Sequence, residues 1–518
     1  MELAPFAAVL PVLLLPAGGP LEGGSGTVSD EKGDEGNAAD EPEAPLPATL
    51  TFNEHLAPVV FANCSSCHRP GEGAPFPLLS YADVRKRAKT ILEVVDERYM
   101  PPWPPVLGHG EFQGSRRLAE RDVALFAKWV ADGMLEGAEH PLPAMPDFPA
   151  GWQLGEPDLV LQMERGFEVP AGGPDVYRNF VLPLELEEDR WVTAIELRPA
   201  ARSVVHHSLF YLDDSGAARE ADGADGTPGF RGMGFRRSGY LGGWAVGATP
   251  RHLPGGLAMS LPKGSDIVLS THFHPSGKPE VERTTIGLYF AEKAPERTLF
   301  GFQVPVLYGR RAGIDIPAGD PAFTIEGSFE VPVDVDLIGA GGHAHYLCRT
   351  LDAVATLPGG EDLPLLRIDD WDFDWQGRYH YAEPVRLPAG TVVRATLVYD
   401  NSAANPENPH SPPQRVQWGL ESTDEMGSVI FSAVPAREAD LPEVYSALRR
   451  QLSRDGTDWI GSLVERAREL DADGDGRITR AEFPARFERF FERIDRDGDG
   501  ALTTEELDDL ARRSASGF

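Results

Sequence analysis

Residues 204–210 read VVHHSLF, residues 269–275 read LSTHFHP and residues 340–346 read AGGHAHY. These three runs hold six of the thirteen histidines in the chain. Each run has the apolar and β-branched composition of a strand, and similar runs recur between glycine and proline turns from about residue 155 to 435. We therefore expect a mainly β region, and its length favours two β-sandwiches, at 155–299 and 300–435.

Clustered histidines in a β region indicate a metal site. Side chains two residues apart share one face of a strand, so His343 and His345 can bind one ion. His206 and His207 are adjacent, so a shared ion needs a bend in the strand or rings that reach around. Imidazole suits copper, zinc, iron and nickel, and the sequence has no HExxH and no facial-triad carboxylate. One cluster alone would more often be a surface or capping pair, but three clusters favour metal binding.

A fourth run, STDEMGSVIF at 422–431, completes an ordered series with the histidine runs. The series resembles the copper type II, ascorbate-dependent monooxygenases, which include the peptidylglycine and dopamine β-monooxygenases, over about 155–435. The resemblance implies two jelly-roll-like sandwiches that each carry one copper ion and face each other across an open, solvent-filled cleft. It implies hydroxylation of a C–H bond of a small organic substrate by O2, with ascorbate as a reductant.

The resemblance also implies the ligands of both copper ions. The electron-storing copper would be held by His206, His207 and His272. The copper that binds O2 and faces the substrate would be held by the catalytic residues His343, His345 and Met426.

Three residues stand apart from that family's pattern. Ile430 occupies the position where the peptide-amidating branch has a tyrosine, so peptide amidation is not implied. Cys348 is alone, whereas the family's best-known cores are disulfide-bonded. His274 shares a strand face with His272, and it is either an outer contact of the copper site or an exchangeable ligand.

Residues 64–68 read CSSCH, and C-x-x-C-H is the attachment sequence of c-type haem. Cys64 and Cys67 would form the thioethers, and His68 would bind the iron. A redox or zinc site would need a βαβ pattern or a second cysteine pair, and Cys348 is the only other cysteine.

The surroundings of this motif predict a helical haem module over 49–145. Residues 56–61 and 118–130 have helical apolar spacing. Met100 lies in a proline-rich loop and is the expected second axial ligand, ahead of His109, Met134 and Met145. The module resembles the all-α class I cytochrome c domain, and a Met/His haem carries electrons.

The C-terminal 466–518 contain two EF-hand loops, preceded by a helical connector at 436–465. Each loop has acidic residues at positions 1, 3 and 5, glycine at 6 and glutamate at 12. The expected Ca2+ ligands are Asp471, Asp473, Asp475, Arg477 and Glu482 in the first loop, and Asp495, Asp497, Asp499, Ala501 and Glu506 in the second. Asp495 lies only 24 residues after Asp471, which favours a structural role over calcium-driven opening.

Composition limits the partners and the compartment. The net charge is −33, from 48 basic and 81 acidic residues, so nucleic acid is not an expected partner. Residues 1–20 resemble a secretory signal and 21–48 an acidic disordered linker, and no run is apolar enough for a membrane span. Haem attachment outside the cytoplasm agrees with a periplasmic or secreted protein.

Together these features predict a copper monooxygenase with a fused haem electron donor and a calcium-binding tail. The alternatives are a non-catalytic haem and copper protein for electron transfer or metal binding, and a structural β-sandwich protein with a haem sensor. Residues 371–375 read WDFDW and alternate strictly, which predicts a half-buried strand with no role in a site.

Overall fold

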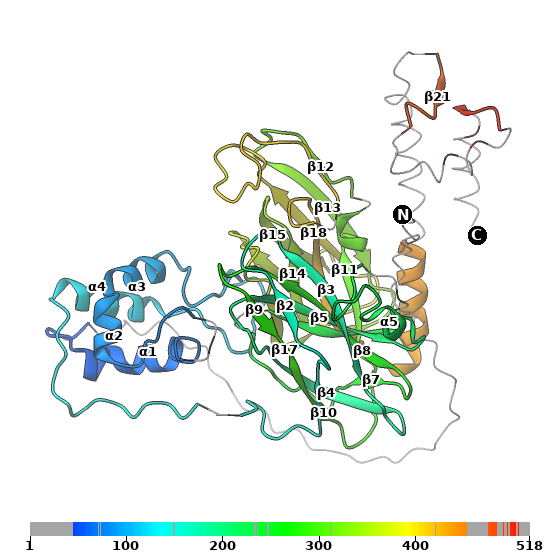
Figure 1. Cartoon of the computed structure of the whole chain (residues 1–518). Helices are drawn as coiled ribbons and strands as arrows, with labels where there is room; N and C mark the ends of the chain where they lie inside the picture. The colour runs from blue at the N-terminus through cyan, green and yellow to red at the C-terminus, as the bar shows by residue number, and fades with distance from the viewer. Residues whose placement is uncertain are drawn as a thin grey trace.

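The structure is a computed structural model (Figure 1). It describes residues 45–452 apart from 71, 73, 149–150, 233–234, 236, 246–247, 311 and 420. In the C-terminal part it describes 475–483, 491, 495, 498–503 and 506. The predictions for residues 1–44 and for most of the connector and tail lie outside the described residues.

The described part of residues 45–148 is helical and lies beside the β body (Figure 1). After a π-helical turn at Phe52–Leu56 come α1 Ala57–Asn63, α2 Tyr81–Lys86, α3 Ala88–Asp96 and α4 Glu120–Ala131. Their apolar faces pack around the buried rings of Phe52, Phe126 and Trp129. The helices predicted at 56–61 and 118–130 are confirmed within a few residues by α1 and α4.

The first group of described strands forms two four-stranded antiparallel sheets around one apolar core. One sheet has the order β1 Leu159–Gln162, β10 Thr285–Phe290, β4 Arg190–Arg198 and β7 Met259–Leu261. The other has the order β3 Val176–Pro183, β8 Asp266–Phe273, β5 Val205–Asp213 and β6 Gly239–Ala245. The remaining elements are β2 Phe167–Val169, which pairs with β9 Glu280–Glu282, and α5 Ala217–Ala221. The histidines of 204–210 and 269–275 therefore lie on the neighbouring strands β5 and β8, or directly after β8.

The second group of described strands repeats this plan around its own core. One sheet has the order β11 Phe300–Val304, β20 Gly427–Pro435, β14 Val335–Ala344 and β17 Arg378–Leu387. The other has the order β13 Phe323–Glu330, β18 Val392–Tyr399, β15 Cys348–Thr356 and β16 Asp362–Ile368. The short strands are β12 Asp315–Ile316 and β19 Val416–Gln417, and the 3-10 turns are Val306–Gly309 and Glu438–Asp440. The predicted mainly β, sandwich-type architecture is confirmed.

Gly342 in β14, directly before His343, allows the side chain of Trp371 to approach the strand closely. A Cβ atom on Gly342 would lie 2.8 Å from the ring atom Cζ3 of Trp371 and 2.8 Å from Cδ2 of Leu351. The missing side chain lets the Trp371 indole pack directly on β14. The loop that begins at Trp371 is thereby fixed next to His343.

The segment that follows the helical loop at Met100 is bound to the second group of strands. The backbone N–H of Val106 donates to the carbonyl oxygen of Arg367 at 2.9 Å, and that of Gln113 donates to His380 at 2.8 Å. The rings of Trp103 and Tyr379 meet at 5.3 Å between centroids. These contacts hold the helical part against the β body.

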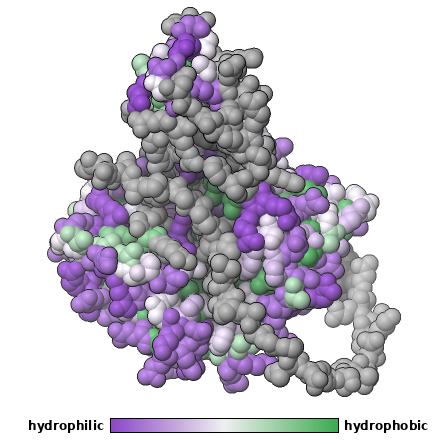
Figure 2. All heavy atoms as spheres, turned by 90° about the vertical axis from the view of Figure 1, so that its right-hand side faces the viewer, coloured by the Kyte–Doolittle hydropathy of each residue, from purple (hydrophilic) through white to green (hydrophobic). Residues whose placement is uncertain are grey.

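The surface and the tail add two observations. The face shown in Figure 2 is mostly hydrophilic where it is coloured, and no helix in the described part of the chain is both long and apolar enough to cross a membrane. In the tail, β21 Arg477–Thr479 pairs antiparallel with β22 Ala501–Thr503.

Candidate metal centres

A bulge in β5 brings two adjacent histidines to one place. Along the pairing of β5 with β8, Val205 faces Phe273 and His207 faces His272, so His206 has no partner in the register. An extra residue of this kind bends a strand and turns its side chain. His206 and His207 can share an ion only if the strand bends, and β5 has this bend.

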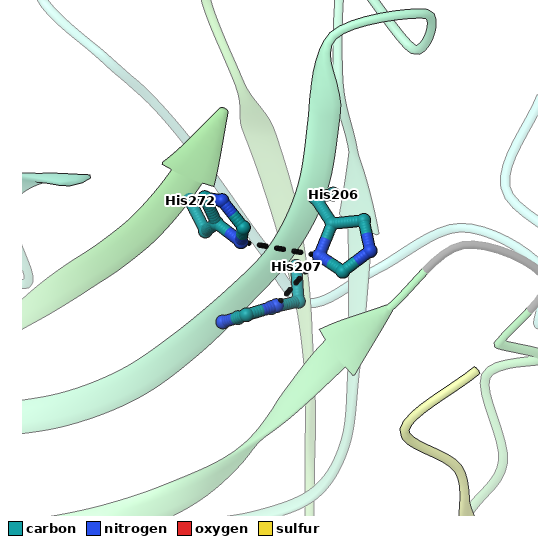
Figure 3. A group of neighbouring side chains, drawn as sticks. All are labelled: His206, His207 and His272. Carbon is teal, nitrogen blue, oxygen red and sulfur yellow. Dashed lines mark hydrogen bonds between the residues drawn. The ribbon is translucent and has the colours of Figure 1, made fainter. Parts of the chain in front are cut away.

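Three imidazole nitrogens converge at this bulge (Figure 3). The Nδ1 atom of His206 lies 3.0 Å from Nδ1 of His207 and 3.1 Å from Nδ1 of His272. The three ligand atoms all lie within 4.8 Å of one another. Imidazole nitrogens that bind one ion at about 2.0 Å are about 3 Å apart, so the distances from His206 to His207 and to His272 fit a shared metal ion.

Two carboxylates hold the outer nitrogens of these rings. Nε2 of His206 lies 2.9 Å from Oδ1 of Asp374, and Nε2 of His272 lies 2.7 Å from Oδ2 of Asp175. The hydrogen bond from His206 lowers the pKa of Asp374, so this carboxylate is an acceptor only. Each carboxylate therefore assigns the ring proton to Nε2 and leaves a lone pair on Nδ1. Lone pairs that face each other at 3.1 Å repel unless a cation lies between them, so the donor set fits a metal.

His274 lies outside this triangle. Its Nδ1 is 2.9 Å from Oδ1 of Asp175, and 67% of its side chain is exposed. One carboxylate thus serves both His272 and His274. This position agrees with the interpretation of His274 as an outer contact of the copper site.

The second histidine pair lies at the end of β14. Nδ1 of His343 is 2.7 Å from Oε1 of Gln376, and Nδ1 of His345 is 3.0 Å from the carbonyl oxygen of Asp424. Both partners accept hydrogen bonds, so each ring donates from Nδ1 and keeps a lone pair on Nε2. The ring centroids are 5.5 Å apart, which agrees with the predicted pairing of these histidines.

The strand register places Met426 beside this pair. His343 faces Ser428 and Ala344 faces Gly427 in the last pairs of β14 with β20, and His345 and Met426 adjoin this last pair. The backbone N–H groups of His345 and Met426 both donate to Oε2 of Glu425. Met426 is buried, with 6% of its surface exposed. The backbone therefore brings together the residues that the sequence placed 81 positions apart, His345 and Met426.

Glu425 is a residue of this centre that sequence reasoning missed. It is fully buried, and its Oε2 accepts from the backbone N–H groups of His345 at 3.0 Å and Met426 at 3.1 Å. Its Oε1 accepts from Leu347 N–H at 2.6 Å. Burial raises its pKa to about 8 despite these donors. The run STDEMGSVIF is polar and acidic up to Glu425, so the sequence carries no signal that this glutamate is buried.

Burial keeps these imidazoles neutral, which metal ligation requires. Burial lowers the pKa of His343 to about 4 and that of His345 to about 3. Burial also lowers the pKa of His207 and of His272, and the neighbouring histidines add to the effect.

The two histidine groups meet at Phe373. Its ring centroid is 5.3 Å from that of His206 and 5.9 Å from that of His345, and the residue is 6% exposed. The Phe373 ring thus contacts an imidazole of each histidine group. The predicted strand at 371–375 is wrong: the segment is a turn, in which Asp374 N–H donates to Oδ1 of Asp372 at 2.8 Å. Aspartate side chains close such turns, and alternation of side chains does not reveal this.

Three residues of the predicted haem site, Cys64, Cys67 and His68, follow the end of α1. Nδ1 of His68 lies 3.0 Å from the carbonyl oxygen of Phe76, which leaves Nε2 for iron and fits an axial ligand. Burial and the nearby Cys67 raise the pKa of Cys64 to about 12, which disfavours a reactive redox thiol. Met100 lines a hollow with Trp103 and Leu118, and its place as the second axial ligand stays a prediction.

The competing ligands are placed differently. Met134 packs against the helical core, Met145 is 40% exposed, and His109 is exposed and contacts its own loop through the carbonyl oxygen of Leu107. None of these contacts sets a side chain beside His68.

In the tail, the glutamate at position 12 of each loop accepts a hydrogen bond within its own loop. Oε2 of Glu482 accepts from Thr479 N–H at 2.8 Å, and Oε2 of Glu506 accepts from Thr503 N–H at 2.9 Å. Asp475, Arg477, Asp495, Asp499 and Ala501 are also described, whereas Asp471, Asp473 and Asp497 lie outside the described residues.

Comparison with known proteins supports the tail alone. The EF-hand family model matches residues 468–485 and 487–511, which confirms the EF-hand prediction and supports Ca2+ binding by the tail. A search of curated proteins found no match. Similar solved structures include the major capsid protein P2 from bacteriophage PM2, with 8% identity over 50% of this chain and 97% of that chain and a TM-score of 0.21. They also include PNGF-II, with 10% identity over 54% and 65% and a TM-score of 0.23. TM-scores this low carry no argument about fold or function.

Acidification of the metal-free protein is expected to test the buried state of His345. The unfolded chain protonates this residue near pH 6.5, whereas the folded chain does so only near its pKa of about 3, so stability falls as the pH falls below 6.5. Between pH 6.5 and 5 the wild type should lose stability relative to His345→Asn, by up to about 1.4 kcal/mol per pH unit. Urea denaturation with a chelator measures the difference, and equal pH slopes would contradict it.

Glu425→Ala is expected to lower the free energy of unfolding by about 2 kcal/mol, because it leaves the buried backbone N–H groups of His345, Leu347 and Met426 without their acceptor. Glu326→Ala, on the exposed side of β13, is the matched control and should change stability by less than about 0.5 kcal/mol. Denaturant midpoints measure both. A loss as small as that of the control would show that Glu425 does not support the centre.

Proposed function

We propose that this protein is a copper monooxygenase that hydroxylates a C–H bond of a small organic substrate with O2. The convergence of three Nδ1 atoms, two of them on rings fixed by carboxylates at Nε2, is the observation that supports this most. His206, His207 and His272 would hold one copper, and His343, His345 and Met426 the other. Copper at the second position would supply the activation of O2.

The donor types favour copper in different roles at the two positions. Three neutral imidazoles suit both oxidation states of copper, as an electron-storing position requires. A soft thioether favours Cu(I), and His343, His345 and Met426 leave one position of a four-coordinate site free. The buried setting of Met426 and His345 excludes bulk water from these ligands.

The helical module would be the electron donor in this proposal, with ascorbate as the other source. Cys64, Cys67 and His68 would hold haem c, with Met100 as the second axial ligand. A Met/His haem has no free position for O2 and transfers single electrons. Contacts of residues 103–113 with β17 keep this module against the sandwich that carries His343. Because haem c is attached outside the cytoplasm, the proposal includes a periplasmic or secreted location.

A non-catalytic protein for electron transfer or metal binding is the second candidate. The buried ring of Phe373 favours it, because this ring packs on an imidazole of each histidine group and leaves little of its own surface exposed to a substrate. Metal content does not separate the two candidates, but product formation does.

Metal analysis of protein produced in a periplasm is expected to give two coppers and one haem per chain. Met426→Ala should abolish hydroxylation and reduce copper toward one equivalent, because the three-histidine group is left intact. Met163→Ala, a buried methionine of the first sandwich, is the matched control and should keep both coppers. Wild type with less than one copper would refute the proposal.

Electron delivery from the haem is expected to be visible without O2. Haem reduced under anaerobic conditions should be oxidised by Cu(II) in the same chain, and the haem absorbance should decay at a rate independent of protein concentration. His272→Ala should slow this decay strongly, because it removes the electron-storing position. Haem that stays reduced while ascorbate supports turnover would show that the module has another task.

A further inference from the structure

One loop of the second sandwich reaches both histidine groups. The bridging loop, residues 371–376, lies between β16 and β17. Its Asp374 contacts Nε2 of His206 at 2.9 Å, and its Gln376 contacts Nδ1 of His343 at 2.7 Å. The ring of Phe373 lies between the two groups. A single short loop thus sets the orientation of one imidazole in each sandwich.

The loop is held so that these contacts depend on each other. Trp371 N–H donates to the carbonyl oxygen of Arg349 at 2.8 Å, and its indole packs on Gly342. Nε2 of Gln376 donates to the carbonyl oxygen of Phe373 at 3.1 Å. Displacement of Asp374 from His206 would therefore move Phe373 and, through it, Gln376.

The residues on either side of the loop are held as well. Val106 binds Arg367 before the loop, and Gln113 binds His380 after it, at 2.9 and 2.8 Å. Movement is thereby confined to the stretch between these two points. This stretch is the part that touches the histidines.

We propose that the bridging loop couples the two metal positions, so that an ion bound by the first histidine group strengthens ion binding by the second. This inference rests on the proposed two-metal function. A metal ion on Nδ1 of His206 draws charge from the ring and makes its Nε2–H a stronger donor to Asp374. The stronger hydrogen bond holds the loop, and the loop holds His343 with Nε2 turned to the second position.

Coupling of this kind is reciprocal and measurable. If the first ion raises the affinity of the second position, the second ion raises that of the first by the same factor. Coupling between sites in one protein is typically about 5–150-fold. Asp374 and Gln376 act as positioning residues here, since neither is a proposed metal ligand.

The test is a double-mutant cycle of copper affinity in the full-length protein. His207→Ala removes a ligand of the first group, and the ring of His207 contacts His206 and His272. Cu(II) titrations followed by electron paramagnetic resonance give the affinity of the second position, identified as the step lost in Met426→Ala. In the wild-type background, His207→Ala should weaken that step at least about 5-fold. In the Asp374→Asn background, His207→Ala should have little further effect.

Asp370→Asn is the matched control. Asp370 lies just outside the loop, its side chain is 83% exposed, and it pairs with Arg349 rather than with a histidine. In the Asp370→Asn background the full effect of His207→Ala should remain. Melting of the metal-free variants checks that each is folded, and His207→Gln replaces His207→Ala if that variant does not fold.

The outcomes separate this inference from the proposed function. If His207→Ala weakens the second position equally with and without Asp374, or does not weaken it, the coupling through the loop is refuted while two-copper binding stands. If neither histidine group binds copper in the wild type, the proposed function fails and this inference fails with it.

Discussion

The arrangement of both histidine groups depends on which ring nitrogen carries the proton. In the first group, carboxylates at Nε2 of His206 and His272 leave the Nδ1 lone pairs to converge at 3.1 Å. In the second group, acceptors at Nδ1 of His343 and His345 leave Nε2 free. The acceptor at one nitrogen of each ring thus decides that the other nitrogen carries the lone pair. Loss of such an acceptor would allow the ring to take the other tautomer, and the lone pairs of the group would no longer point to one place.

The outer partners come from distant parts of the chain, and this explains why the two sandwiches must be held together. Asp175 precedes β3 of the first sandwich and serves His272 on β8 of the same sandwich. Asp374 belongs to the second sandwich but serves His206 of the first. The apolar contact of Leu257 with Ile338 and Val434 also joins the two sandwiches. The geometry at His206 is therefore a property of the assembled pair of sandwiches.

Much of this centre could be predicted from the sequence, because strand periodicity is local. The spacing of His343 and His345 and the need for a bend at His206 follow from the alternation of side chains along a strand. The EF-hand loops follow from their fixed spacing, and the family match confirms them. The partners Asp175, Asp374, Gln376 and Glu425 could not be predicted, because each meets its histidine through tertiary packing that no local pattern records.

The segment at 371–375 shows why local patterns fail at this place. Its alternation of aromatic and acidic residues is as typical of a strand as any in the chain, but Asp372 closes a turn and Gly342 admits Trp371 against β14. The apolar and acidic residues are then used separately: Phe373 packs against imidazole rings, and Asp374 binds His206. A strand would place these two side chains on opposite faces, where only one of them could reach the histidines. The turn is what allows both to contact His206, so the departure from the expected strand is also the source of the centre's bridging loop.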